Sequence, residues 1–221
     1  ESLTTMNDFT IILGNKNYSS WSLRSWLALK QTGVAFDEEV IPLYEAGSVT
    51  KLLAHSPAAK VPILKHGDLT VWDSLAICEY LAEQFPEACL WPTDTNERAL
   101  ARAISAEMHS GFVALRGDMS MDMRHSAPDH IPGPGVDADI MRISEIWNEC
   151  RAAHSGTGDG PFLFGDFTIA DAMFAPIASR FRTYGVDLDS VCADYVEAIH
   201  TWPAFVKWFE AGVIEPYVIN W

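Results

Sequence analysis

The chain has 221 residues, of which 48% are hydrophobic, so it can bury a sizeable core in one large or two small domains. Thirty acidic against fifteen basic residues give a formal charge of −15, which disfavours binding to nucleic-acid phosphates or anionic membranes. No apolar run reaches the roughly 18 residues of a membrane span, and no basic-then-apolar leader opens the chain. We expect a cytoplasmic protein that binds neither nucleic acid nor membrane, with Met6 as its natural start.

The first predicted elements are a buried strand over residues 9–13, which ends at Gly14, and a helix that follows a cluster of serines. Ser19, Ser20 and Ser22 have hydroxyls that can cap this helix and do nothing else. The same hydroxyls, with the unpaired backbone N–H groups of the first helical turn, would also suit an anion. The stretch alone leaves both interpretations open.

A proline marks the next informative segment. A second strand is predicted over residues 36–41, and a polar loop with one short helix over 45–55. In Lys60-Val61-Pro62 the proline interrupts an otherwise apolar strand, so we expect Pro62 at a sheet edge or in a cis peptide bond. The N–H and C=O of Val61 would then be free to pair with a peptide-like ligand.

A second polar helix start follows a predicted hairpin. The turn at residues 66–68 and a returning strand over 69–72 lead to Asp73-Ser74, which opens a helix that Pro86 stops. A carboxylate and a hydroxyl here are ordinary caps. They could also hold an α-amino acid group, with Asp73 on the ammonium and Ser74 with backbone N–H groups on the carboxylate.

After residue 95 the pattern becomes wholly helical. One long helix is predicted over residues 96–117, a Pro/Gly-rich break over 127–136, and another helix over 137–154. The cysteines are widely spaced, and no histidine has carboxylates or cysteines at ligand spacing, so we predict reduced thiols and no metal site. Cys78 is expected to pack in an apolar helix.

The last third of the chain contains a structural signal. Thr168 and Asp171 have the spacing of a capping box at the start of a very apolar helix, which we expect to be buried. Helices over residues 190–200 and 203–211 follow. The apolar tail, residues 213–221, is expected to fold back onto the protein.

The order of these elements resembles the cytosolic glutathione transferases over nearly the whole chain. The residues specific to the resemblance are Val61-Pro62 with Leu64, the Asp73-Ser74 pair and the 168–171 capping box. The serine cluster is similar to the serine subclasses, especially zeta and tau, whose serine lies five residues before an arginine. Counting back from Arg24 gives Ser19, with Ser20 and Tyr18 as alternatives.

The resemblance implies an α/β thioredoxin-like, glutathione-binding domain over residues 8–86, a linker over 87–95 and an all-helical substrate-binding domain over 96–221, assembled as a homodimer. Ser19 or Ser20 would be catalytic. The implied glutathione-binding residues are Lys60, Val61, Pro62, Asp73 and Ser74. The implied substrate-binding residues are Trp21, Met108, His109, Phe112 and Arg116.

The implied activity is a glutathione S-transferase that acts on a small hydrophobic electrophile, with peroxidase activity as an addition. Two departures from the zeta pattern bear on this: Trp21 replaces a cysteine and Asp73 replaces a glutamine. The alternatives are a glutathione-dependent isomerase, such as a maleylacetoacetate isomerase, or dehalogenase, and a non-catalytic glutathione-binding or scaffold protein.

Overall fold

A four-stranded sheet forms the first part of the computed structural model, which describes residues 8–154, 156 and 159–219. The strand order is β2-β1-β3-β4. β1 (Phe9–Leu13) pairs in parallel with β2 (Phe36–Val40), while β3 (Ile63–His66) runs antiparallel to both β1 and β4 (Leu69–Trp72). The predicted strands are confirmed, and the expected start at Met6 lies outside the described residues.

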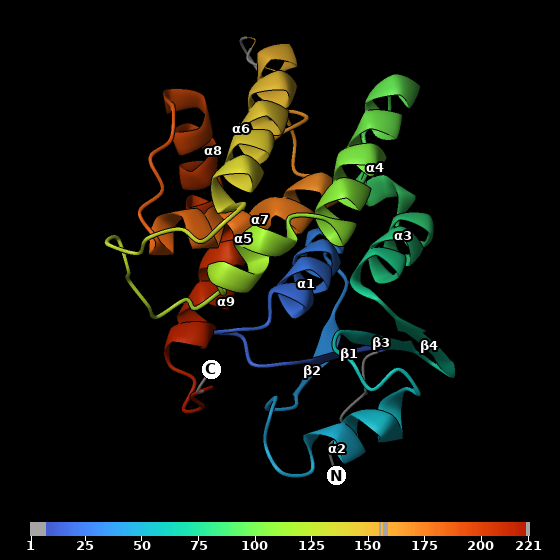
Figure 1. The fold of residues 1–221 in the computed structure, drawn as a ribbon. Coiled ribbons are helices and arrows are strands. Elements are labelled where there is room, and N and C mark those ends of the chain that lie inside the picture. Colours follow the sequence, from blue (N-terminus) through green and yellow to red (C-terminus); the bar gives the residue numbers. More distant parts are fainter. Residues whose placement is uncertain (1–7, 155, 157–158, 220–221) are drawn as a thin grey trace.

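Helices cover both faces of the sheet (Figure 1). α1 (Ser20–Thr32) and α3 (Ser74–Gln84) lie on one face, and α2 (Ser48–His55) lies on the other. Side chains alternate along β1, so Ile11 faces the large core beneath α1 while Ile12 packs with Leu52 of α2. The short helix expected in a polar loop therefore contributes to a core. A 3-10 turn, η1 (Pro86–Ala88), ends the first part.

Six helices form the second part of the described chain: α4 (Thr95–Ser110), α5 (Val113–Asp118), α6 (Val136–Ala153), α7 (Ile169–Thr183), α8 (Ser190–Thr201) and α9 (Pro203–Val213). α7 is buried along almost its whole length and packs against α1, α4 and α8. α1 lies between the sheet and this helical part (Figure 1). The expected fold, a thioredoxin-like α/β unit followed by an all-helical unit, is confirmed.

The single helix predicted over residues 96–117 is wrong. The chain leaves the helix at Gly111, and Phe112 has a φ of 55° in the left-handed region before α5 begins. The apolar period hid this break, because Met108, Phe112 and Leu115 are all buried on either side of it. Arg116 Nη1 donates to the Gly111 carbonyl at 2.8 Å and stabilises the break.

The capping box and the returning tail are both observed. Thr168 and Asp171 form the box at the start of α7. Beyond α9, Glu215 accepts hydrogen bonds from the loop between β1 and α1, although Ile214 and Val218 stay exposed. Residues 220 and 221 of the predicted tail lie outside the described part of the chain.

Candidate functional site

The serine loop, residues 14–19, joins β1 to α1. Ser19 is the N-cap of α1: its Oγ accepts a hydrogen bond from the Ser22 N–H at 3.3 Å and donates to the Ser22 Oγ at 2.7 Å. Ser22 Oγ also accepts from the Gly14 N–H at 3.0 Å. The Ser19 hydroxyl is thus part of a chain of hydrogen bonds that begins in the backbone of the loop.

The two alternatives to Ser19 lie differently. Ser20 is the first residue of α1, and its side chain is 9% exposed. Its hydroxyl has no hydrogen-bond partner in the part of the chain that the structure describes. Tyr18 directs its hydroxyl towards the helical part, where Arg124 Nη2 lies 3.0 Å away. Two serine hydroxyls therefore remain at the start of α1, where the backbone N–H groups favour negative charge.

The start of α3 packs beside α1, where Ser25 Oγ donates to the Ser74 carbonyl at 3.3 Å. Asp73 caps α3 by accepting the Leu75 N–H at 3.0 Å, and its other oxygen lies 3.2 Å from His109 Nε2. The φ of Asp73 is 71°, a left-handed value that few non-glycine residues adopt. Ser74 is buried, and its Oγ has no partner among the described residues. A buried hydroxyl without a partner is unfavourable, so this helix start suits a polar ligand.

The predicted backbone site precedes β3. The Val61-Pro62 peptide bond is cis, one of the two arrangements expected for this proline. Within the described ranges no group pairs with the N–H or C=O of Val61, because β3 begins only at Ile63. Lys60 is exposed next to it. The edge of the sheet therefore presents one free donor and one free acceptor.

Trp21 brings three of the predicted substrate-binding residues together. The guanidinium of Arg116 lies 4.9 Å from the centre of the Trp21 ring, and the His109 ring lies 5.3 Å away, edge-on. Met108 is fully buried in the core and presents no surface there. Phe112 is also buried, at the break before α5. Trp21, His109 and Arg116 are thus the three predicted residues that this arrangement makes accessible.

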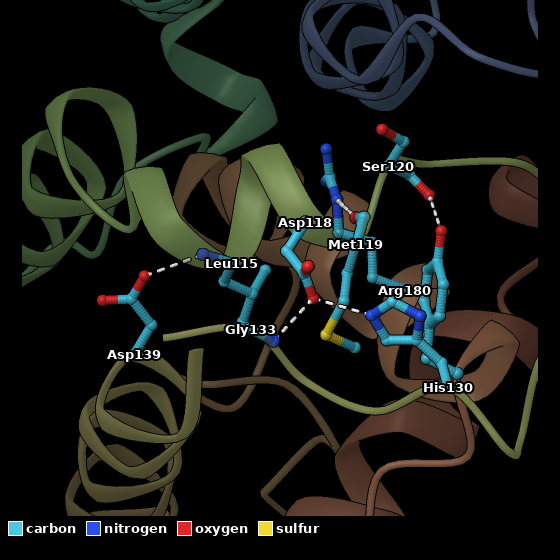
Figure 2. A network of polar contacts seen from close by, with 9 residues as sticks. Leu115, Asp118, Met119, Ser120, His130, Gly133, Asp139 and Arg180 are labelled. Carbon is cyan, nitrogen blue, oxygen red and sulfur yellow. Dashed lines mark hydrogen bonds and ion pairs between the residues drawn. The ribbon is translucent and has the colours of Figure 1, made fainter. Parts of the chain in front are cut away.

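Figure 2 shows how the end of α5, the helix of Arg116, is held. The Asp118 carboxylate lies 2.7 Å from His130 Nε2, and Arg180 Nε donates to the Met119 carbonyl at 2.7 Å. Both contacts tie α5 to segments that follow it in the chain. Arg116 is therefore presented from a fixed helix.

The burial of two arginines behind Trp21 was not predicted from the sequence. Arg24 lies 4.2 Å from the Trp21 ring; its Nε donates to the Met173 carbonyl, but neither Nη atom has a partner among the described residues. Burial, and then repulsion from Arg180 and Arg116, holds the pKa of Arg24 well below its usual value. Burial and Arg116 likewise lower the pKa of Arg180 to about 10.

These three guanidiniums, Arg24, Arg116 and Arg180, are called the arginine cluster. No described carboxylate forms an ion pair with any of them, although the chain carries a net charge of −15. Unpaired buried cations are unfavourable. A signal for the cluster existed only for Arg116, because the burial of Arg24 and Arg180 depends on how α1 packs against α7.

The described residues at this site include neither a metal-binding group nor a cysteine with a lowered thiol pKa. In residues 8–154, 156 and 159–219 there is no group of three or more His, Cys, Asp or Glu side chains that could hold a metal ion. Cys78 is buried as predicted, and burial raises the pKa of its thiol to about 12. Among the helices of the described residues, none has the length and apolar character needed to cross a membrane.

Comparisons with known proteins agree on one family. Residues 18–84 match the N-terminal domain of glutathione S-transferases, and residues 124–211 match the C-terminal domain. A probable maleylacetoacetate isomerase of Caenorhabditis elegans is 31% identical over 172 residues, which is 76% of this chain and 77% of the relative. Maleylacetoacetate isomerase of Rattus norvegicus is 30% identical over 175 residues, 76% of each chain.

A solved structure with the same fold carries a ligand. A Burkholderia glutathione transferase homolog with bound glutathione superposes with a TM-score of 0.70 at 24% identity. The match covers 91% of this chain and 96% of that one. At this identity the likeness establishes the fold.

Proposed function

Because the chain belongs to the glutathione S-transferase family, we propose that it binds glutathione against its sheet and activates the thiol with a serine hydroxyl. The acceptor would be a small hydrophobic electrophile. The observation that carries this proposal is the packing of the start of α3 against the second turn of α1, where Ser25 Oγ donates to the Ser74 carbonyl at 3.3 Å. The start of α1 offers serine hydroxyls, and the start of α3 offers a carboxylate beside a buried hydroxyl without a partner among the described residues.

The residues at the second helix start fit the γ-glutamyl end of glutathione. The ligand carboxylate would give Ser74 Oγ the partner that it lacks among the described residues. Asp73, whose side chain is half exposed, would hold the ammonium group. The free N–H and C=O of Val61, next to Pro62, would pair with the cysteinyl backbone as an added strand does, and Lys60 would face the glycine carboxylate.

Helix geometry supports the position of the thiol. Ser19 and Ser25 are six residues apart, which corresponds to about 9 Å along α1 at ~1.5 Å per residue. An extended γ-glutamyl-cysteine unit spans a comparable length at roughly 3.5 Å per residue. A peptide held at Asp73 and Ser74 would therefore place its sulfur at the serine loop.

The energies required are modest. A free thiol has a pKa of about 8.5, so a depression of about two units, or roughly 2.7 kcal/mol, leaves it mostly ionised at pH 7. One hydroxyl hydrogen bond to a charged acceptor supplies about 1.5–3 kcal/mol, and the helix N-terminus adds about 0.3–1 kcal/mol. The serine donates a hydrogen bond and needs no base, because the nucleophile is the sulfur that glutathione supplies.

Three further properties belong to the same proposal: peroxidase activity, a cytoplasmic location and a homodimer. The edge strand β4 supports the homodimer, since Leu69 and Trp72 are each 46% exposed on it. We also propose that residues 8–86 fold as the glutathione-binding domain and 96–221 as the substrate-binding domain, joined by 87–95.

The test is an ultraviolet difference titration of glutathione bound to the wild-type protein, which follows thiolate absorbance against pH. We expect an apparent thiol pKa near 6.5, about two units below that of free glutathione. A control titration uses S-methylglutathione, which has no thiol to ionise. Bound glutathione with an unshifted thiol pKa would refute the transferase mechanism and leave a glutathione-binding protein.

The arginine cluster favours a second candidate function, a glutathione-dependent isomerase whose substrate carries carboxylates. The relatives named maleylacetoacetate isomerase support the reaction class. The arginine cluster supports a negatively charged substrate, because Arg116 is accessible beside Trp21 and no described carboxylate neutralises it. A ligand carboxylate would supply the missing anion.

Charge selectivity separates the two candidates. If the isomerase candidate is correct, replacing Arg116 with glutamine should raise the KM for a carboxylated electrophile about 10-fold or more, because one charge-assisted hydrogen bond is lost. The KM for a neutral electrophile should change less than about 2-fold. Arg182→Gln, an exposed charge change on α7, is the matched control. Equal effects on both electrophiles would count against a carboxylate site.

A further inference from the structure

The segment after α9, which belongs to the helical part, forms hydrogen bonds with the serine loop. The Glu215 carboxylate accepts the N–H of Lys16 at 2.7 Å through one oxygen and the N–H of Asn17 at 2.9 Å through the other. These two residues lie 199 and 198 positions away in the sequence. A single side chain thus satisfies two consecutive backbone donors of the loop that presents Ser19.

Asn17 is tied to the helical part by every polar group that it has. Its N–H donates to Glu215, and its C=O accepts the Met123 N–H at 3.2 Å. Its side-chain Oδ1 accepts the Arg124 N–H at 3.0 Å, and its Nδ2 donates to Asp122 Oδ1 at 2.7 Å. The Asn17 side chain is fully buried. The loop therefore has one defined position relative to the helical part.

Arg124 forms hydrogen bonds with both the segment after α9 and Tyr18 of the serine loop. Its Nη1 donates to the Glu215 carbonyl at 2.6 Å, and its Nη2 donates to the Tyr217 carbonyl at 2.7 Å. The same side chain contacts the Tyr18 hydroxyl at 3.0 Å. Arg124 thus holds the segment after α9 in the position from which Glu215 reaches the loop.

α9 itself contacts the backbone of the serine loop. Trp208 Nε1 donates to the Lys16 carbonyl at 2.9 Å. A Cβ atom added at Gly212 would lie 3.2 Å from the Asn17 nitrogen, which is closer than ordinary van der Waals contact. The glycine therefore permits the close approach that the other contacts require.

We propose that Glu215 is a positioning residue, which acts through the serine loop to hold the Ser19 hydroxyl where it stabilises the glutathione thiolate. The inference rests on the proposed serine mechanism. A hydroxyl hydrogen bond to sulfur depends on a position defined to a few tenths of an ångström, and misplacement by about 1 Å can cost about 10²-fold in rate. Ser19 is only two residues from Asn17. Movement of the loop backbone at Lys16 and Asn17 would therefore displace the Ser19 hydroxyl directly.

The sign of one measurement distinguishes positioning from simple electrostatics. Removing the negative charge of Glu215 would by itself stabilise a nearby thiolate and lower the thiol pKa. Loosening the loop would weaken the serine hydrogen bond and raise the thiol pKa. Positioning and charge therefore predict opposite shifts for the same substitution.

The test compares Glu215→Gln with Glu210→Gln, which removes an exposed charge from α9, in the full chain. Glutamine keeps one acceptor but turns its amide group towards the second loop N–H. We expect the pKa of bound glutathione to rise by about 0.5–1 unit and kcat to fall about 10-fold, with KM for glutathione within about 2-fold. Hydrogen exchange of the loop peptide should quicken in Glu215→Gln alone.

Gly212→Ala is the second variant, because it displaces the loop without changing any charge. It should raise the thiol pKa in the same direction as Glu215→Gln. A lowered or unchanged thiol pKa in Glu215→Gln would overturn the proposal, whether or not the loop exchanges faster. An unshifted thiol pKa in the wild type would instead refute the serine mechanism itself, so the two failures are distinct.

Discussion

Replacing Ser19 with alanine should raise the thiol pKa of bound glutathione by about one to two units, since the variant loses one hydrogen bond of about 1.5–3 kcal/mol to a charged acceptor. A shift from about 6.5 to about 8.5 lowers the thiolate fraction at pH 6.5 from about one half to about one hundredth. The rate with a neutral electrophile at that pH should fall roughly 5-fold for a rise of one unit and roughly 50-fold for a rise of two units. The measurement is the ultraviolet titration, with initial rates across the same pH range.

The hydrogen-bond chain in the loop explains why an engaged hydroxyl can still serve. Without a ligand, Ser19 Oγ donates to Ser22 Oγ, which accepts from the Gly14 N–H. A thiolate is a stronger acceptor than a hydroxyl, so the Ser19 proton is expected to turn to the sulfur while Ser22 donates back to Ser19. Such chains polarise one another, so Ser22→Ala should raise the thiol pKa by a smaller amount.

Two variants control this result. Ser19→Thr keeps both the hydroxyl and the N-cap, so it should preserve most of the pKa shift and separate catalysis from helix capping, whose loss costs about 1 kcal/mol. Ser20→Ala tests the competitor, whose hydroxyl has no partner in the described part of the chain. A larger pKa rise in Ser20→Ala than in Ser19→Ala would transfer the role to Ser20.

Local signals in the sequence were sufficient for the elements and for the polar helix starts. The apolar run of β1, the turn before β4 and the spacing of Thr168 and Asp171 each depend on neighbouring residues, and all three are observed. The break at Gly111 was not predicted, because the apolar period continues across it. A period reports which face is buried and says little about one or two residues that leave the helix.

The contacts around the site could not be predicted from the sequence for a different reason, since they join residues that lie far apart in the chain. Arg24 served only as a marker for counting back to Ser19, and nothing near it indicates that two of its nitrogens are buried without a described partner. Glu215 lies in a segment that was predicted to fold back, yet its pairing with Lys16 and Asn17 spans nearly the whole chain. Such pairings depend on tertiary packing, which no local pattern specifies.

Replacing Asp171 with alanine should lower the free energy of unfolding by about 3–5 kcal/mol, because several buried donors lose their acceptor at about 1–3 kcal/mol each; this is a large share of the roughly 5–15 kcal/mol of a typical protein. The fully buried carboxylate accepts the Leu163 N–H at 3.0 Å, the Thr168 N–H at 2.8 Å and the Tyr195 hydroxyl at 2.9 Å. Burial raises the pKa of Asp171 to about 6, so the carboxylate is ionised at pH 7.5. Alanine would leave these buried donors without an acceptor.

Tyr195→Phe is the matched control for this prediction, because it removes one donor and leaves the carboxylate with the others. It should cost about 0.5–1.5 kcal/mol, the usual contribution of one hydrogen bond. Urea unfolding followed by tryptophan fluorescence measures both variants, with Trp147 as a reporter only 4.7 Å from the Tyr195 ring. Equal midpoints for the two variants would show that the carboxylate matters only through the tyrosine.

The same variant should weaken the site from a distance. α7 begins at the capping box and carries Met173, whose carbonyl accepts the hydrogen bond from Arg24 of α1. A frayed start of α7 would therefore loosen the support of the helix that presents Ser19. Because a ligand stabilises only the folded state, glutathione at about 100 times the wild-type Kd should add about 2.7 kcal/mol to the stability of the wild type, and the same amount to Asp171→Ala if the site of the variant is intact. A smaller recovery in Asp171→Ala would show that the capping box holds the site as well as the fold.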